Sequence, residues 1–353
     1  MKPIRICMVG AGRVGKQHSR SILGHLPNAV CSALVDPNVD ILEATGNEFE
    51  YENRFTSLEE ALEAVEFDAV IITTPTFTHR ELAVLAAGEG KHVFLEKPMA
   101  LDLEECDDII EATRKAKVIL QIGFMRRFDP EFRAASERIQ SGEIGRPMLI
   151  KSLTHGPGLP PSWAYDLKTS NGMLAEVNSH DWDTLRWLTS SNLERVYVET
   201  ANFKGAQLGV TTEHFYDNVV VSTKFENGAL GSISGICPCG YGYDARVEVV
   251  GEKGIIQIGS LSAQSVVVCT DRDKGLSTPI YRTWPERFAW GYINELKHFV
   301  HCISAEEEPF VTGEDGRWAV AGVLAANRSF LEGRPVGLAE VMSTPASSAV
   351  RPS

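Results

Sequence analysis

Short runs of apolar residues alternate with longer amphipathic stretches through the first third of the chain. The apolar runs are continuous, which is typical of strands that are buried on both faces of a sheet. They predict strands at 4–9, 30–35, 69–72, 92–95 and 118–122. The stretches between them predict helices at about 14–23, 58–64, 80–87 and 103–115. This order is typical of an α/β fold with a doubly wound parallel sheet, which we assign to residues 1–123.

The pattern changes after residue 124. A helix is predicted at about 130–141 and a strand at 147–153, and a loop rich in proline and glycine follows. Strands then succeed one another without helices between them, at 195–200, 218–225, 228–234, 245–250, 254–258 and 265–269. The Asn227–Gly228 pair between two of them predicts a type I′ hairpin turn. We therefore predict an α+β domain with a large, open, mainly antiparallel sheet over residues 124–342.

The end of the chain adds two helices, at about 288–304 and 314–332, to this second domain. Residues 343–353 are small, polar and proline-containing, so we expect a disordered tail.

Composition narrows the class of protein and of partner. At 353 residues and 43% hydrophobic, the chain is long enough for two domains of a soluble globular protein. It contains neither a long apolar run nor a signal-peptide pattern, and we expect a cytoplasmic protein. A formal net charge of −13 argues against nucleic acid and anionic membranes as partners. The seven cysteines have no zinc-site spacing, so we expect buried thiols and no metal.

A glycine motif lies between the first predicted strand and the first predicted helix. In that context the glycines allow a tight turn and a close approach of a pyrophosphate to the helix N-terminus, although an ordinary strand-to-helix turn is the alternative. The motif comprises Gly10, Gly12, Arg13, Val14 and Gly15. Asp36 ends the second predicted strand, where a carboxylate accepts hydrogen bonds from ribose hydroxyls and repels a 2′-phosphate. The cofactor predicted from these residues is NAD rather than NADP.

Two further segments follow strands, at the edge of the sheet where ligands bind in this type of fold. Thr74, Pro75 and His79 follow the third long strand and are predicted to line the cofactor site, although Thr76 or Thr78 would also serve as a helix cap. Glu96 and Lys97 follow the fourth strand, so we expect Lys97 close to a bound nicotinamide; a surface lysine is the alternative.

An acidic residue and a histidine lie four residues apart on a predicted helix of the second domain. Glu176 and His180 have this spacing and Asp183 follows three residues later, which would put all three on one helix face. A carboxylate beside a histidine fixes its tautomer, as a general base requires. Such pairs also occur on protein surfaces, so this pattern alone leaves both readings open.

Together these segments resemble the glucose–fructose oxidoreductase, inositol dehydrogenase and rhizopine-catabolism family (Gfo/Idh/MocA) over nearly the whole chain. The resemblance is carried by four segments in order: 10–15, 74–79, 90–98 and 171–183. It implies a Rossmann domain that binds NAD, a second domain for substrate binding and oligomerisation, and alcohol oxidation that depends on a lysine and a histidine. The residues of this sequence that match those roles are Lys97 and His180, with Glu176 beside the histidine.

Two stretches, 123–129 and 241–251, look most like the inositol dehydrogenase branch of that family. Similar enzymes place the residues that match Arg127 and Tyr243 near the substrate ring. We also expect Tyr165 to contact a ring-shaped polyol, and structural packing of its ring is the alternative. The sequence departs from the family at Glu176, where aspartate is usual. Glutamate is one methylene longer than aspartate, so the sequence leaves open which polyol, and which stereochemistry at the oxidised carbon, the site takes.

The function expected from the sequence is oxidation of a secondary alcohol of a cyclitol, myo- or scyllo-inositol, to the ketone. We expect His180 to take the hydroxyl proton, Lys97 to stabilise the developing charge on oxygen, and Glu176 to orient His180. The alternatives are an aldose or keto-sugar dehydrogenase or reductase, a non-catalytic NAD-dependent sensor, and an NAD-assisted lyase or glycosidase. An open sheet leaves one face to cover, so we also expect a homo-oligomer, a dimer or a tetramer.

Overall fold

The computed structural model describes residues 2–264, 268–269 and 276–343. Residue contacts divide the chain into two compact units. The first contains Met1–Asp129 and Trp290–Val320, and the second contains Pro130–Ala289 and Ala321–Ser353. The expected disordered tail, except for Ser343, and part of the strand expected at 265–269 lie outside the described residues. The assignment of functional domains to 1–123 and 124–342 stays a prediction.

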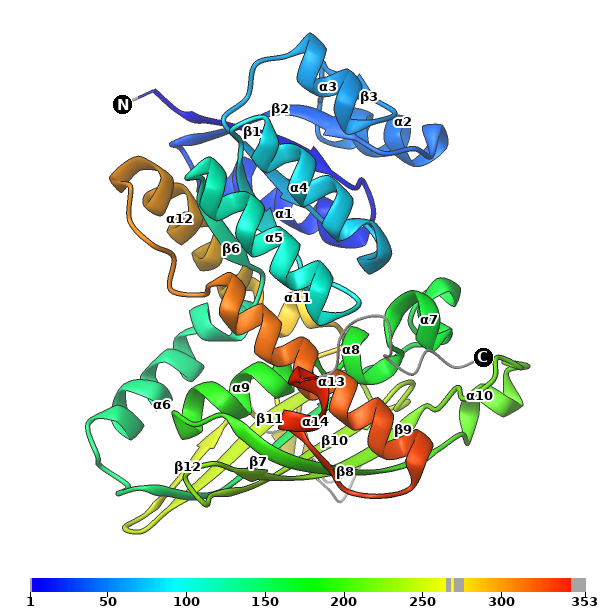
Figure 1. Ribbon diagram of the computed structural model, residues 1–353, viewed down its shortest axis with the longest axis vertical. Helices are drawn as coiled ribbons and strands as arrows, with labels where there is room; N and C mark the ends of the chain where they lie inside the picture. Colours follow the sequence, from blue (N-terminus) through cyan, green and yellow to red (C-terminus); the bar gives the residue numbers. More distant parts are fainter. Residues whose placement is uncertain (1, 265–267, 270–275, 344–353) are drawn as a thin grey trace. The chain divides into compact units, whose positions relative to one another are not determined.

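The first unit contains a parallel six-stranded sheet in the order β3-β2-β1-β4-β5-β6, which confirms the doubly wound fold (Figure 1). The six strands are β1 (Ile4–Val9), β2 (Ala29–Val35), β3 (Arg54–Phe55), β4 (Ala69–Ile72), β5 (His92–Leu95) and β6 (Leu120–Ile122). The helices between them are α1 (Arg13–His25), α2 (Val39–Glu48), α3 (Leu58–Ala64), α4 (His79–Gly88) and α5 (Leu103–Ala116). The sequence pattern missed α2 and β3.

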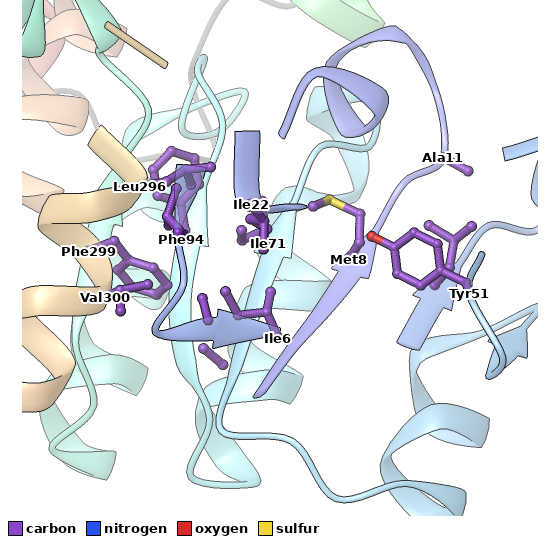
Figure 2. Packing of buried hydrophobic residues seen from close by; sticks show 14 of the residues in the cluster. Ile6, Met8, Ala11, Ile22, Tyr51, Ile71, Phe94, Leu296, Phe299 and Val300 are labelled. Carbon is purple, nitrogen blue, oxygen red and sulfur yellow. The ribbon is translucent and has the colours of Figure 1, made fainter. Parts of the chain in front are cut away.

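One face of this sheet packs against helices from both ends of the chain. Ile6 and Phe94 of the sheet share a buried cluster with Ile22 of α1 and with Leu296 and Phe299 of α12 (Ala289–Ala305), as Figure 2 shows. Strand residues alternate between the two faces, and the opposite face is buried as well. Because both faces are buried, these strands read as continuous apolar runs.

The second unit contains a seven-stranded sheet in the order β12-β11-β7-β10-β9-β8-β15. Its pairs are antiparallel except β7 with β10, which are parallel. The strands are β7 (Pro147–His155), β8 (Leu193–Ala201), β9 (Asn218–Phe225), β10 (Leu230–Ile236), β11 (Asp244–Gly251), β12 (Ile255–Ile258) and β15 (Val336–Gly337). The predicted open, mainly antiparallel sheet is confirmed. Helices α6 (Pro130–Gln140) and α9 (Ser179–Thr189) cover one of its faces (Figure 1).

The hairpin between β9 and β10 forms where it was predicted, but its turn type differs. The amide of Phe225 donates to the carbonyl of Ala229 over 2.9 Å. Gly228 has a φ of +88° and Asn227 does not have a positive φ. A type I′ turn needs a positive φ at both central residues, so that prediction is wrong.

The remaining helices are short or late in the chain: α7 (Leu167–Ser170), α8 (Met173–Glu176), α10 (Lys204–Gln207), α11 (Trp284–Arg287), α13 (Gly313–Glu332) and α14 (Leu338–Met342). A small hairpin pairs β13 (Val268–Cys269) with β14 (Leu276–Ser277). Among the described residues, no helix combines the length and apolar character needed to cross a bilayer.

The cluster around Phe299 yields a stability prediction. Phe299 is fully buried, and its ring packs edge-to-face on Phe94 with 5.7 Å between ring centroids. Phe299→Ala should therefore lower the free energy of unfolding by about 3–5 kcal/mol through lost burial and the cavity left behind. Urea denaturation followed by circular dichroism measures this change. The control Phe203→Ala, at a side chain that is 63% exposed, should change it by less than about 0.5 kcal/mol. Equal effects of the two substitutions would contradict the assigned core.

Candidate active site

Two glycines of the predicted motif are required by close packing. Gly10 has a φ of +105°, and a Cβ there would lie 2.6 Å from Thr73 Oγ1. A Cβ on Gly15 would lie only 2.0 Å from the Gly10 carbonyl oxygen. Thr73 Oγ1 donates to the same carbonyl over 2.9 Å, which ties the loop after β1 to the end of β4. Close packing of these backbone atoms therefore fixes the shape of the turn.

The middle glycine, Gly12, is open instead of crowded. A Cβ on Gly12 would meet nothing within 4 Å. Gly12 is the N-cap of α1, and it provides no side-chain cap for the first amides of that helix. The first turn of α1, which includes Arg13 and Val14, contains no acidic residue. Free amides at a helix N-terminus, with space in front of them, fit the pyrophosphate of a dinucleotide.

Asp36 lies at the end of β2 and is half-buried. Its Oδ2 accepts a hydrogen bond from the Ala11 amide over 2.8 Å, and its Oδ1 accepts one from the Asn38 amide over 2.9 Å. Each carboxylate oxygen can accept a further bond, so the group can hold the glycine loop and still accept ribose hydroxyls. The structure thus places Asp36 beside the glycine motif, as the sequence predicts.

His79 connects the two segments that follow β4 and β5. It is buried, and its Nε2 and Nδ1 lie 2.9 Å from the carbonyl oxygens of Thr74 and Pro98 respectively. Burial lowers the pKa of this imidazole. Thr78 Oγ1 donates to Pro75 O over 2.8 Å within the same turn. The neutral ring can donate to one of these carbonyl oxygens, and with a carbonyl oxygen 2.9 Å from each nitrogen the buried His79 holds the loop in place.

Glu96 and Lys97 directly follow β5. Glu96 is buried, and its Oε1 lies 2.7 Å from Nε2 of His18 in α1. Its Oε2 accepts a hydrogen bond from the Lys97 amide over 3.2 Å. Lys97 itself is half-buried. The sequence pattern did not identify His18, although a histidine three residues after Gly15 on the buried face of α1 is a visible signal.

Arg127, predicted near the substrate ring, has partners within the first unit. It is buried, and its guanidinium Nη2 lies 2.9 Å from Asp315 Oδ1. The guanidinium carbon lies over the ring of Phe310, 5.7 Å from the ring centroid. The ion pair joins the segment after β6 to the start of α13.

The catalytic residues predicted in the second unit lie on two helices rather than one. Glu176 is the last residue of α8, and His180 is the second residue of α9, which begins at Ser179. Val177 and Asn178 form a turn between the two helices. The prediction that Glu176, His180 and Asp183 share one continuous helix face is therefore wrong. Their spacing was right, but it did not reveal the break. His180 and Asp183 are buried, and Glu176 is half-buried.

A buried carboxylate next to His180 fixes the start of α9. Asp181 accepts hydrogen bonds from Thr154 Oγ1 and Asn178 Nδ2, both over 2.7 Å, and from Ser152 Oγ over 2.5 Å. Ser152 and Thr154 belong to β7, so Asp181 ties His180 to the sheet. Sequence reasoning missed this group. The signal was there in Ser152 and Thr154, two polar residues on the buried face of a strand.

The two tyrosines predicted to contact substrate lie in different surroundings. Tyr165 is half-buried and packs edge-to-face on Phe215 with 5.0 Å between centroids. Tyr243 is buried and packs against Phe288 at 6.2 Å.

Comparisons with known protein families match segments in both units of the chain. The model of an oxidoreductase family with an NAD-binding Rossmann fold matches residues 4–124, and the Gfo/Idh/MocA C-terminal domain model matches residues 132–257. This chain belongs to the Gfo/Idh/MocA family. The expected fold and NAD-binding domain are thereby confirmed.

Individual relatives are similar over nearly their full length. The chain is 34% identical to a myo-inositol 2-dehydrogenase of Thermotoga maritima, over 96% of this chain and all of the relative. It is 35% identical to a scyllo-inositol 2-dehydrogenase (NAD(+)) of Bacillus subtilis, over 95% and 96% of the two chains. Scyllo-inositol dehydrogenase from Lactobacillus casei, solved with bound NAD(H) and scyllo-inositol, superimposes with a TM-score of 0.88. It is 27% identical, over 96% of this chain and 100% of that one.

The position of Asp36 yields a prediction for cofactor binding. Asp36→Ala removes the acceptor for ribose hydroxyls and the bond to the Ala11 amide, so the Kd for NADH should rise by about 10- to 100-fold. The Kd for NADPH should rise far less, because the repulsion of its 2′-phosphate is removed as well. Fluorescence titration of both nucleotides measures the ratio. Asp40→Ala, on the exposed side of α2, is the matched control. An unchanged preference for NADH in Asp36→Ala would exclude the assigned role.

Proposed function

We propose that this chain is an NAD-dependent inositol dehydrogenase, which oxidises one secondary hydroxyl of myo- or scyllo-inositol to the ketone. The observation that carries the proposal is similarity over nearly the full length to two enzymes named for this reaction, at 34% and 35% identity. Three features of the first unit support the NAD-binding part of the proposal: the glycine loop, the open N-terminus of α1 and Asp36.

The residues of the first unit fit the cofactor. The α1 amides after Gly12 would hold the pyrophosphate, and Asp36 would hold the adenosine ribose. NAD⁺, when bound, accepts the hydride that leaves the carbinol carbon. Thr74 and Pro75 are proposed to line the site, in the loop whose shape His79 maintains.

The acid–base work is proposed for Lys97 and His180. Lys97 holds the hydroxyl oxygen and stabilises the negative charge that develops on it as the carbon–hydrogen bond breaks. His180 takes the hydroxyl proton as general base, and Glu176 orients the imidazole. Because Asp181 fixes the start of α9 through three hydrogen bonds, the His180 backbone is held in one position.

The predicted substrate contacts have unequal support. Tyr165 is half-buried and so has surface to offer a ring-shaped polyol. Arg127 already has Asp315 as its ion-pair partner, and Tyr243 is almost fully buried. Contacts of Arg127 and Tyr243 with substrate stay predictions.

Turnover by two variants tests the proposal. Lys97→Ala and His180→Ala should each lower kcat for inositol oxidation by at least about 100-fold, because each removes a proton-transfer or charge-stabilising group. The affinity for NADH should stay near that of the wild type. The measurement is NADH absorbance with myo-inositol, scyllo-inositol, D-glucose and D-xylose in turn. Lys115→Ala, on the exposed side of α5, is the control.

The substrate panel also separates the alternatives. Preference for one inositol supports the proposal, and preference for glucose or xylose would replace it with an aldose dehydrogenase. Absence of NADH formation from every polyol, together with tight NADH binding, would contradict a dehydrogenase of polyols.

We also propose that the chain forms a homo-oligomer through the second face of the seven-stranded sheet. Three apolar side chains on that face, Val220, Leu230 and Ile255, are 61%, 53% and 53% exposed. Their strands pair in a register that puts all three on the side opposite the buried residues. Exposed apolar residues gathered on one sheet face are typical of an interface between protein chains.

Substitution on that face tests the oligomer. Val220→Lys with Leu230→Lys should shift the molecular mass in solution toward the monomer, because like charges would meet across a symmetric interface. Light scattering after size-exclusion chromatography measures the mass. Leu208→Lys, at a side chain 64% exposed away from the sheet, is the control. A wild-type protein that is already monomeric would contradict the proposal.

A further inference from the structure

Three ionisable side chains from separate segments meet inside the first unit. They are His18 of α1, Glu96 after β5 and Glu295 of α12, and their ligand atoms all lie within 4.8 Å of one another. His18 and Glu295 are fully buried and Glu96 is 5% exposed. The predicted catalytic set contains Lys97 but neither His18 nor Glu295.

The three members have unequal hydrogen bonding. His18 Nε2 donates to Glu96 Oε1 over 2.7 Å, and the Lys97 amide donates to Glu96 Oε2 over 3.2 Å. Glu96 is thus a carboxylate with two donors. Neither carboxyl oxygen of Glu295 has a hydrogen-bond partner among the described residues. A buried carboxylate without donors is far less stable than the neutral acid, because nothing replaces the water it has lost.

Among the residues that the structure describes, no lysine or arginine pairs with the Glu295 carboxyl group. His18 of α1 already donates to Glu96. The rings of Phe94 and Tyr292 pack edge-on against its imidazole, with ring centroids 5.2 and 5.7 Å from the imidazole centroid. Gln121 of β6 donates its side-chain amide to the backbone carbonyl of Glu295 over 2.9 Å, not to its carboxyl group. The charged group that faces the Glu295 carboxyl is therefore Glu96, and it has the same sign.

We propose that Glu295 is a neutral carboxylic acid in the folded protein and that, with His18 and Glu96, it forms a buried proton-holding cluster with one ionised carboxylate. That carboxylate is Glu96, which fixes the backbone of Lys97 through the Lys97 amide. Glu295 is thus a positioning residue: it keeps a second negative charge away from Glu96 without weakening the two bonds that Glu96 accepts. The link to Lys97 as a catalytic group rests on the proposed function, whereas the proton on Glu295 does not.

The packing around Glu96 supports a cluster of fixed geometry. A Cβ on Gly123 would lie 3.1–3.2 Å from the carboxyl carbon and both carboxyl oxygens of Glu96. A larger residue at position 123 would press on the carboxylate that His18 and the Lys97 amide hold. Glycine at this position leaves the room that the cluster needs.

The cluster makes the protein take up one proton on folding. Burial and the charge of Glu96 raise the pKa of Glu295 well above its ordinary value of 4.5. Above pH 4.5 the unfolded chain has released this proton and the folded chain still holds it, so stability falls as pH rises, until the folded pKa is reached. Within that window the unfolding equilibrium constant should rise by an additional factor of about ten per pH unit. Glu295→Gln keeps a neutral side chain of the same shape and should lose this additional factor.

Two measurements test the proposal. The first uses wild-type protein with ¹³C-labelled glutamate carboxyl groups; near neutral pH, infrared and NMR spectra should show one protonated glutamate that is absent in Glu295→Gln. The second compares urea unfolding of wild type and Glu295→Gln from mildly acidic to mildly alkaline pH. Glu81→Gln, the same change on the exposed side of α4, should keep the wild-type pH dependence.

Several results would overturn the proposal. One is a wild-type spectrum in which every glutamate is ionised near neutral pH. This measurement needs no variant and holds even if Glu295→Gln does not fold. Another is the same pH dependence of unfolding in wild type and Glu295→Gln. A third is about one equivalent of a transition metal in the purified protein that Glu295→Gln loses, since one histidine and two carboxylates would then be its ligands. None of these measurements uses turnover, so they are independent of whether inositol is the substrate.

Discussion

The approach of Gly15 to the Gly10 carbonyl is the contact on which the cofactor half of the structure depends. With room for no side chain between them, α1 begins directly against the end of β1. Thr73 then holds the Gly10 carbonyl, and Asp36 holds the Ala11 amide. Three strands thus converge on one turn, and the first amides of α1 remain uncapped beyond it. A polar ligand with negative charge is what such a turn can bind, because the backbone supplies the donors and the helix dipole favours an anion.

In the second unit, His180 lies in the first turn of α9, which follows a two-residue turn after α8. The position of that first helical turn must be fixed if His180 is to act as a base. Packing of apolar residues alone would leave the first turn of α9 free to shift. Asp181 prevents this, because its carboxylate accepts three hydrogen bonds, two of them from β7. A buried carboxylate is stable only when its acceptors are satisfied, so the same bonds that stabilise Asp181 specify where His180 lies.

The sequence predicts those parts of the structure that depend on local pattern. The central strands of the parallel sheet are continuous apolar runs, and β4, β5 and α3 were predicted with the bounds that the structure has. Strand β3 pairs with β2 at the edge of the sheet and is two residues long, which is too short to leave a pattern. The break after Glu176 was missed because the spacing of Glu176, His180 and Asp183 suits a continuous helix equally well.

Contacts between segments that lie far apart in the sequence could not be predicted from local patterns. The late segment Trp290–Val320 belongs to the first unit, where Leu296 and Phe299 of α12 complete the sheet's core. Asp36 and Lys97 could be assigned because a strand end positions them. His18, Glu96 and Glu295 could not be assigned as a cluster, because only the tertiary packing of α1, β5 and α12 brings them together.

The way other buried charged groups of this protein are paired also supports a neutral Glu295. The chain is strongly acidic overall, and two of its buried arginines have acidic partners: Arg127 with Asp315, and Arg287 with Glu131 over 2.6 Å. An ionised group inside a protein is stable only with such a partner, and breaking a buried pair is costly. Glu295 has no cation among its described contacts and has Glu96 beside it. Holding a proton is the one change that brings Glu295 into agreement with the rest of the interior, and it leaves the single charge of Glu96 next to Lys97.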